Sequence, residues 1–184
     1  MDKNKQQIIN FGLYIVSTPI GNMEDTTYRA LNILKKSDLI LCEDTRRSLK
    51  LLSHFNIKNQ LLSYHKFNEE KIGEKVIGLL KKNKIISLIT DAGTPTISDP
   101  GMLLVKKCIK ESLSVYPVPG SSAPTTAVSI SGFGDKYLFY GFLSKKDNEI
   151  EKVLNNLSNV NYSLVFFIPS KKINFYLSKF KKYF

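Results

Sequence analysis

The chain has 184 residues, a formal net charge of +11 and 42% hydrophobic residues, which is typical of a folded globular protein and excludes a disordered chain. No apolar run approaches the ~18 residues of a membrane-spanning helix, which argues against a membrane protein. Residues 1–10 are polar and lack the apolar core of a signal peptide, so we predict a flexible leader there. We therefore expect a cytoplasmic protein that does not contact a membrane.

Strand-like and helix-like patterns alternate along residues 11–118. The expected strands are residues 11–17, 39–42, 61–64, 85–89 and 114–118, and the expected helices include residues 26–36, 69–82 and 102–109. A further helical face is expected at Leu49, Leu52 and Phe55. This alternation predicts an α/β domain with a mostly parallel five-stranded sheet that is covered by helices on both faces.

In the first expected helix, particular residues predict where the helix begins and which face it buries. Asp25 precedes the helix at residues 26–36 and is its predicted N-cap, since aspartate is favoured at that position. The helical spacing of Tyr28, Leu31 and Leu34 predicts the buried face.

The connections after the strands carry most of the polar and glycine-containing motifs. Right-handed crossovers place every strand-to-helix loop of a parallel sheet at the same edge. The loops at Pro19, Glu43, Asp91 and Pro119 should therefore lie together. Ligands of open α/β sheets bind at that edge, outside the carboxyl ends of the strands.

The connection at residues 90–101 is the richest of these loops. It holds two glycines, two prolines, two aspartates and several hydroxyl side chains, and it is longer than a strand-to-helix linker needs to be. Gly93 and Gly101 permit close approach of a ligand to the main chain. Asp91 and Asp99 offer acceptors for ribose hydroxyls or for a cation. An ordinary turn-rich connection is the alternative.

Residues 119–184 are expected to form a second α/β domain, beginning in a Pro-, Gly- and Ser-rich stretch. The expected helices are residues 125–130, 150–157 and 172–183, and the expected strands are residues 137–142 and 162–168. About sixty residues are few for an independent domain, so we expect this second domain to be incomplete.

Cysteine and histidine residues give no metal signal. Cys42 and Cys108 each lie in an apolar run and form no CxxC pair, which is typical of buried, reduced thiols. His54 and His65 stand at no metal-ligand spacing with another histidine or with a cysteine. We therefore predict no metal.

The charge balance suggests a polyanionic partner. Lysine and arginine number 27 against 16 aspartates and glutamates, and such an excess can neutralise nucleic-acid phosphates. Lysine enrichment is equally expected from AT-rich coding sequence. The adjacent Arg46 and Arg47 are more informative, because guanidinium groups bind phosphate in a bidentate manner.

Five short segments of the chain together resemble a known family. They are residues 91–95 (DAGTP), 98–101 (SDPG), 18–22 (TPIGN), 43–46 (EDTR) and 119–123 (PGSSA). Their order and spacing resemble the tetrapyrrole-methylase-like methyltransferases, which use S-adenosylmethionine. Within that family they resemble the ribosomal RNA small subunit methyltransferase I group. The resemblance covers about residues 13–146.

The resemblance implies a two-domain tetrapyrrole-methylase-like fold and 2'-O-methylation of cytidine 1402 in 16S rRNA. It implies S-adenosylmethionine as methyl donor, the small ribosomal subunit as partner and a homodimer. It also implies cofactor contacts by Asp91, Ala92, Gly93, Thr94, Pro95, Gly120, Ser122, Ala123, Gly141 and Phe142. RNA contacts are expected from Arg46, Arg47, Lys145 and Lys146. For the two lysines, a solvated basic face is an equal alternative.

No residue is singled out as the catalytic base. A ribose hydroxyl is a weak acid, so a proton acceptor would assist methyl transfer. Asp99 and Asp25 are candidates, but either could instead cap a helix or bind ribose.

Two other functions remain open from the sequence. One is methylation of a small tetrapyrrole or corrinoid precursor by the same fold. The other is a truncated, inactive RNA-binding remnant, which would fit a second domain that is incomplete.

Overall fold

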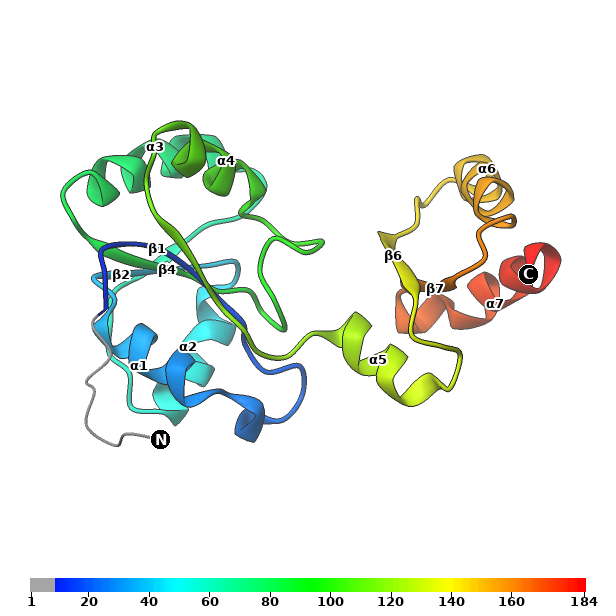
Figure 1. Cartoon of the computed structure of the whole chain (residues 1–184), viewed down its shortest axis with the longest axis horizontal. Coiled ribbons are helices and arrows are strands. Elements are labelled where there is room, and N and C mark those ends of the chain that lie inside the picture. Colours follow the sequence, from blue (N-terminus) through cyan, green and yellow to red (C-terminus); the bar gives the residue numbers. More distant parts are fainter. Residues whose placement is uncertain (1–8) are drawn as a thin grey trace. The chain divides into compact units, whose positions relative to one another are not determined.

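The computed structural model describes residues 9–184, so most of the expected leader at residues 1–10 lies outside the described residues. The chain divides into two units, Met1–Ser122 and Ala123–Phe184 (Figure 1). The sequence predicted the boundary between residues 118 and 119. The division in the structure falls four residues later, between residues 122 and 123, at the end of the same Pro-, Gly- and Ser-rich loop. Each unit is described by itself.

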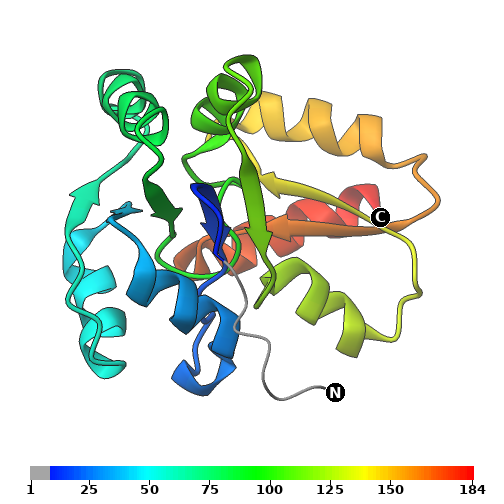
Figure 2. The same ribbon diagram turned by 60° about the vertical axis from the view of Figure 1, so that its left-hand side comes forward.

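The first unit is built on five parallel strands in the order β3-β2-β4-β1-β5 (Figures 1 and 2). The strands are β1 (Gly12–Val16), β2 (Leu39–Cys42), β3 (Leu61–Ser63), β4 (Ile85–Leu88) and β5 (Val115–Val118). The helices are α1 (Tyr28–Lys36), α2 (Thr45–His54), α3 (Glu69–Leu80) and α4 (Met102–Lys110), with a short 3-10 turn, η1 (Met23–Asp25). The predicted parallel five-stranded sheet is confirmed.

Helices cover both faces of this sheet, with α1 and α2 on one side and α3 and α4 on the other (Figure 1). Successive strand residues point to opposite faces, and β2 shows this directly. Leu39 and Leu41 join the core under α3 and α4, whereas Ile40 and Cys42 join the core under α1 and α2. Burial on both faces explains why β2 is a continuous apolar run. β4 is apolar except for Ser87, whose buried hydroxyl lies 2.7 Å from the Ser37 hydroxyl. Cys108 is also fully buried and both thiols are free, as predicted.

Two details of the helices differ from the sequence prediction. The N-cap of α1 is Thr27, whose hydroxyl accepts from the Ala30 N–H at 3.1 Å. Asp25 lies instead in the preceding 3-10 turn. The helix therefore starts two residues later than expected, and Tyr28 is 92% exposed instead of buried.

Helix α2 is rotated relative to the expected apolar face. Its buried positions are Ser48, Leu51 and Leu52, while Leu49 is exposed. Residues 48, 51 and 52 follow the i, i+3, i+4 spacing of one helical face, and Leu49 lies off it.

The second unit contains a two-stranded parallel sheet, β6 (Tyr137–Phe142) and β7 (Ser163–Phe167). Its helices are α5 (Ala123–Ser131), α6 (Asp147–Leu157) and α7 (Ile173–Tyr183), with a 3-10 turn η2 (Ser170–Lys172). Its buried core consists of Leu143, Ile150, Leu154 and Tyr176. Across residues 9–184, no helix has the length and apolar character required to cross a bilayer.

Candidate functional site at the carboxyl edge of the sheet

The connection between β4 and α4 crosses the carboxyl edge of the sheet and is fastened over the end of β1. Thr18 N donates to Gly93 O at 2.9 Å, and Gly93 N donates to Thr18 O at 3.0 Å. The Thr18 hydroxyl also donates to Thr90 O at 3.1 Å. Gly93 has φ +87°, a conformation that glycine adopts far more readily than residues with a Cβ. These bonds fix the Asp-Ala-Gly-Thr-Pro segment at the edge where the sequence predicted a ligand site.

On the β5 side, the same loop is joined to the chain after β5. The Thr94 hydroxyl donates to Ser121 O at 3.1 Å and lies 3.0 Å from the Ser17 hydroxyl. Gly120 packs directly on Ser17, since a Cβ at residue 120 would lie 2.9 Å from the Ser17 Cβ. The loops after β1, β4 and β5 are therefore tied together, as the topology predicted.

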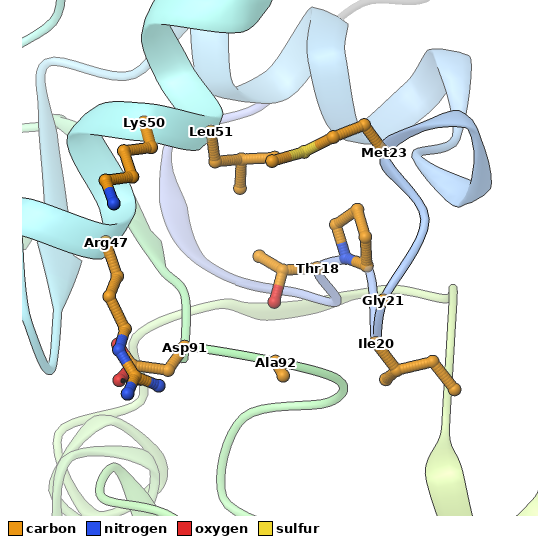
Figure 3. Close-up of a pocket in the computed structure, with 10 residues that line it drawn as sticks. Thr18, Ile20, Gly21, Met23, Arg47, Lys50, Leu51, Asp91 and Ala92 are labelled. Carbon is orange, nitrogen blue, oxygen red and sulfur yellow. Dashed lines mark ion pairs between the residues drawn. The ribbon is translucent and has the colours of Figure 1, made fainter.

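On the β2 side, Asp91 meets the start of α2. Arg47 Nη1 lies 3.2 Å from Asp91 Oδ2, and Figure 3 shows the Arg47 side chain reaching from α2 to this carboxylate. The Asp44 N–H donates to Asp91 Oδ1 at 3.3 Å. Arg46 pairs instead with Asp44, with 2.8 Å between Nη2 and Oδ2. Both predicted RNA-binding arginines thus lie at the carboxyl edge of the sheet, which we call the ligand edge.

Three hollows share this edge. The α2 pocket (Figure 3) has a volume of ≈ 340 Å³ and is lined by Thr18, Pro19, Ile20, Gly21, Met23, Arg47, Lys50, Leu51, Asp91 and Ala92. The arginine pocket has a volume of ≈ 510 Å³ and is lined by Glu43, Asp44, Thr45, Arg46, Arg47, Ser63, His65, Lys66, Phe67 and Asp91. The Asp99 pocket has a volume of ≈ 340 Å³ and is lined by Glu43, Lys66, Glu69, Ser98, Asp99, Pro100, Met102 and Leu103. Asp91 and Glu43 connect each hollow to the next.

The carboxylates of these pockets repel one another. Loss of hydration raises the pKa of Asp99 to about 6, with further contributions from the charges of Glu43 and Asp91, while a hydrogen bond with Thr90 opposes the rise. Desolvation, together with the Asp91 charge, also raises the pKa of Glu43. In contrast, hydrogen bonds from Arg46 lower the pKa of Asp44 to about 2. A cationic group bound beside Glu43 and Asp99 would relieve this repulsion.

The predicted cofactor residues fall in both units. Residues 91–95, Gly120 and Ser122 belong to the linked loops of the first unit. Ala123 begins α5 in the second unit. Gly141 lies at an irregularity in the register of β6, with φ +86°, and the neighbouring Phe142 is exposed. Their joint role in one site stays a prediction.

The remaining predicted residues are exposed. Lys145 and Lys146 precede α6, and Lys146 Nζ lies 3.0 Å from Glu149 Oε1. Asp25 is exposed on the 3-10 turn η1.

Several residues that line the pockets were not predicted from the sequence. Met23 and Lys50 contribute to the α2 pocket, and His65 and Phe67 contribute to the arginine pocket. His65 and Phe67 follow the third strand, so their place at the edge could have been inferred from topology. No pattern in the sequence distinguishes Met23 or Lys50 from ordinary surface residues.

No metal centre is evident at these pockets. Over the described part of the chain, no group of three or more His, Cys, Asp or Glu side chains is arranged to hold a metal ion.

A parallel sheet with linked loops and hollows at its carboxyl edge is the arrangement in which open α/β proteins bind their ligands. Residues 12–178 match the Tetrapyrrole (Corrin/Porphyrin) Methylases, and the chain belongs to this family.

Curated relatives are identical to this chain at nearly half of the aligned positions. It is 48% identical over 162 residues to the Ribosomal RNA small subunit methyltransferase I of Thermotoga maritima. Identity to proteins of the same name is 44% over 156 residues in Halalkalibacterium halodurans and 46% over 167 residues in Rickettsia prowazekii. The matches cover 88%, 84% and 90% of this chain, but 72%, 54% and 60% of those three proteins.

Solved structures share the fold at much lower identity. A cobalt precorrin-4 methyltransferase of cobalamin biosynthesis superposes with a TM-score of 0.69 at 16% identity, covering 92% of this chain and 74% of that one. A uroporphyrin-III-C-methyltransferase from Thermus thermophilus gives 0.64 at 17% identity, covering 94% and 74%. These likenesses confirm the tetrapyrrole-methylase fold and carry no information on substrate.

Proposed function

We propose that this chain is an S-adenosylmethionine-dependent methyltransferase that modifies the ribose 2'-hydroxyl of cytidine 1402 in 16S rRNA. The observation that carries the proposal is the identity of 43–48% to several proteins named Ribosomal RNA small subunit methyltransferase I. The solved structures of tetrapyrrole methyltransferases are only 16% and 17% identical to this chain, so they give no comparable support to a corrinoid or porphyrin substrate.

The residues at the carboxyl edge fit the proposed methyl donor. S-Adenosylmethionine, when bound, supplies a methyl group from a positively charged sulfonium. Repulsion among Glu43, Asp91 and Asp99 favours a cationic ligand beside them. Asp91 also offers carboxylate oxygens to ribose hydroxyls. We propose that residues 91–95, Gly120 and Ser122 hold the cofactor, together with Ala123, Gly141 and Phe142 from the second unit.

The same edge offers groups for RNA. Arg46 and Arg47 present planar donors suited to phosphate, and their pairing with Asp44 and Asp91 orients both side chains. We propose that they hold the RNA backbone next to the cofactor loops, with Lys145 and Lys146 as further phosphate contacts. Holding the ribose oxygen in line with the methyl group would supply much of the rate enhancement.

Between the two candidate proton acceptors, we favour Asp99. A base acts best when its pKa lies near the working pH, and the pKa of Asp99 is about 6. Asp99 also lines a pocket at the ligand edge, whereas Asp25 is exposed on a short turn. We further propose that the protein acts in the cytoplasm and that it forms a homodimer. Sedimentation equilibrium would test the oligomeric state.

The function is tested by methyl transfer to small ribosomal subunits that lack the modification. The chain is incubated with tritiated S-adenosylmethionine and the subunits, and labelled 16S rRNA is digested to nucleosides. The proposal expects label in 2'-O-methylcytidine from one site. The proposal would be overturned if the label were found in a nucleobase, if no RNA were labelled, or if only an added tetrapyrrole precursor were labelled.

A further inference from the structure

Phe67 is an exposed aromatic side chain at the ligand edge. Its exposed fraction is 94%, although phenylalanine is among the residues most often buried. It lies between β3 and α3, on one of the loops that leave the carboxyl ends of the strands. Neither the fold nor the proposed cofactor site accounts for it.

The loop that carries Phe67 is held at both ends. Tyr64, at its start, is 1% exposed and packs into the core under α3 and α4. Asn68, at its end, accepts from the His65 N–H at 2.8 Å and donates to Ser63 O at 3.0 Å. The Asn68 N–H also donates to His65 O at 2.9 Å. The backbone is therefore fixed with Phe67 pointing into solvent, which lowers the entropy lost when a ligand binds to the ring.

Basic side chains share a pocket with the ring. Phe67 lines the arginine pocket, whose charged lining consists of Lys66, Arg46 and Arg47 together with the carboxylates Glu43, Asp44 and Asp91. The two arginines are turned toward carboxylates, but both remain largely exposed. Over residues 9–184, no ion pair involves Lys66, which leaves its ammonium available to an anion. The imidazole of His65 lies edge-on to the phenyl ring, with 6.1 Å between centroids.

An aromatic ring beside basic side chains is the usual arrangement for binding single-stranded nucleic acid. Bases of unpaired RNA stack on aromatic rings while basic groups contact the backbone. We propose that Phe67 is a stacking platform for one unpaired nucleobase of the RNA substrate, with Lys66 and Arg46 contacting the neighbouring phosphates. This inference rests on the proposed function and assigns Phe67 a substrate-binding role.

The test compares binding of a fluorescein-labelled, single-stranded oligocytidylate to four variants by fluorescence anisotropy. Phe67→Ala removes the ring, Phe67→Leu keeps apolar bulk without an aromatic face, and Phe67→Trp keeps the face. Phe11→Ala is the matched control, because Phe11 is an exposed phenylalanine that precedes β1 at the opposite edge of the sheet. Thermal unfolding should be unchanged by the substitutions of Phe67, since so exposed a side chain contributes little to stability.

We expect Phe67→Ala to weaken oligocytidylate binding by about fivefold to 150-fold, the range for loss of one base–aromatic stack. Phe67→Leu should be weakened nearly as much, Phe67→Trp should bind at least as well as wild type, and Phe11→Ala should be unchanged. Equal affinity of wild type and Phe67→Ala would overturn the inference. Full affinity of Phe67→Leu would also overturn it, because a general apolar surface, such as a protein contact, would then explain the exposure.

A second readout separates this inference from the proposed function. Phe67→Ala should retain the wild-type affinity for S-adenosylmethionine, measured by calorimetry, and should show a raised KM for ribosomal subunits with little change in kcat. If wild type methylates the subunits and Phe67→Ala does so with unchanged KM, the stacking role is wrong while the proposed function stands. If wild type methylates no RNA but binds oligocytidylate through Phe67, the proposed function is wrong while the stacking role stands.

Discussion

The protonation of Asp99 gives a quantitative test of the electrostatics at the ligand edge. Its pKa rises from an ordinary 3.8 to about 6 in the folded chain, mainly through loss of hydration and then through the charges of Glu43 and Asp91. Each unit of pKa shift corresponds to about 1.4 kcal/mol. The rise from 3.8 to about 6 therefore corresponds to at most about 3 kcal/mol of stability lost when Asp99 ionises. The loss is smaller than this limit because water still reaches the partly buried carboxyl.

The sign of the pH dependence follows from the raised pKa. Below the unfolded value of 3.8, Asp99 is protonated in both states and its favourable contribution is fully present. As the pH rises toward about 6, the unfolded state loses its proton first, so the free energy of unfolding falls. Asp99→Asn fixes a neutral side chain of nearly the same shape, with an oxygen that can still accept from Thr90.

The assay is urea unfolding at a series of pH values from about 3.5 to 7.5, followed by circular dichroism, for wild type and Asp99→Asn. The difference in unfolding free energy between the two should grow with pH, by up to about 3 kcal/mol in favour of Asp99→Asn, and should level off above about pH 6. Asp25→Asn, at an exposed carboxylate, should follow the wild-type profile. A constant difference between Asp99→Asn and wild type, or a difference that shrinks as the pH rises, would refute this reasoning.

Gly101→Ala should destabilise the chain by about 1–3 kcal/mol. The reason is that φ at residue 101 is +127° and that a Cβ there would collide with the Leu88 side chain. An unchanged midpoint of thermal unfolding would contradict this packing. Burial raises the pKa of the Cys108 thiol to about 11, and Cys42 is buried as well. Both cysteines should therefore react with Ellman's reagent only as fast as the chain unfolds locally. Prompt reaction of the native protein would contradict this burial. Arg46→Ala should weaken RNA binding and should reduce the slope of log affinity against log salt concentration by about 1. Lys36→Ala, at the far end of α1, is the control and should leave both unchanged. Equal slopes for wild type and Arg46→Ala would argue against a phosphate contact.

Much of the first unit follows from its sequence because its central strands, β1, β2 and β4, are buried on both faces. A segment such as β2 must then be a continuous apolar run, and runs separated by amphipathic helices indicate parallel strands. From that topology the loops at Pro19, Glu43, Asp91 and Pro119 were expected at one edge. The structure joins the loops after β1, β4 and β5 by the bonds at Thr18, Thr94 and Ser121.

The remaining features depend on tertiary contacts that no local pattern records. The start of α1 was misplaced because Asp25 and Thr27 are both good N-caps, and only the 3-10 turn of Met23–Asp25 decides between them. The Arg47–Asp91 pair joins a helix to the loop of a neighbouring strand, which sequence spacing cannot reveal. The exposure of Phe67 follows from the hydrogen bonds by which Asn68 folds the loop, and these are not visible in the sequence.

We propose that the loop after β4 forms the methyl-donor site of a methyltransferase. Calorimetric titration of the chain with S-adenosylmethionine is the decisive measurement. We expect saturable binding that is lost in Asp91→Ala and in Gly93→Val, since residue 93 has φ +87° and lies against Ile20 and Ser121. Gly78→Val is the control, because a Cβ at Gly78 meets no atom within 4 Å. If the folded chain does not bind S-adenosylmethionine, or if Gly93→Val and Asp91→Ala bind it as wild type does, this loop is not the methyl-donor site.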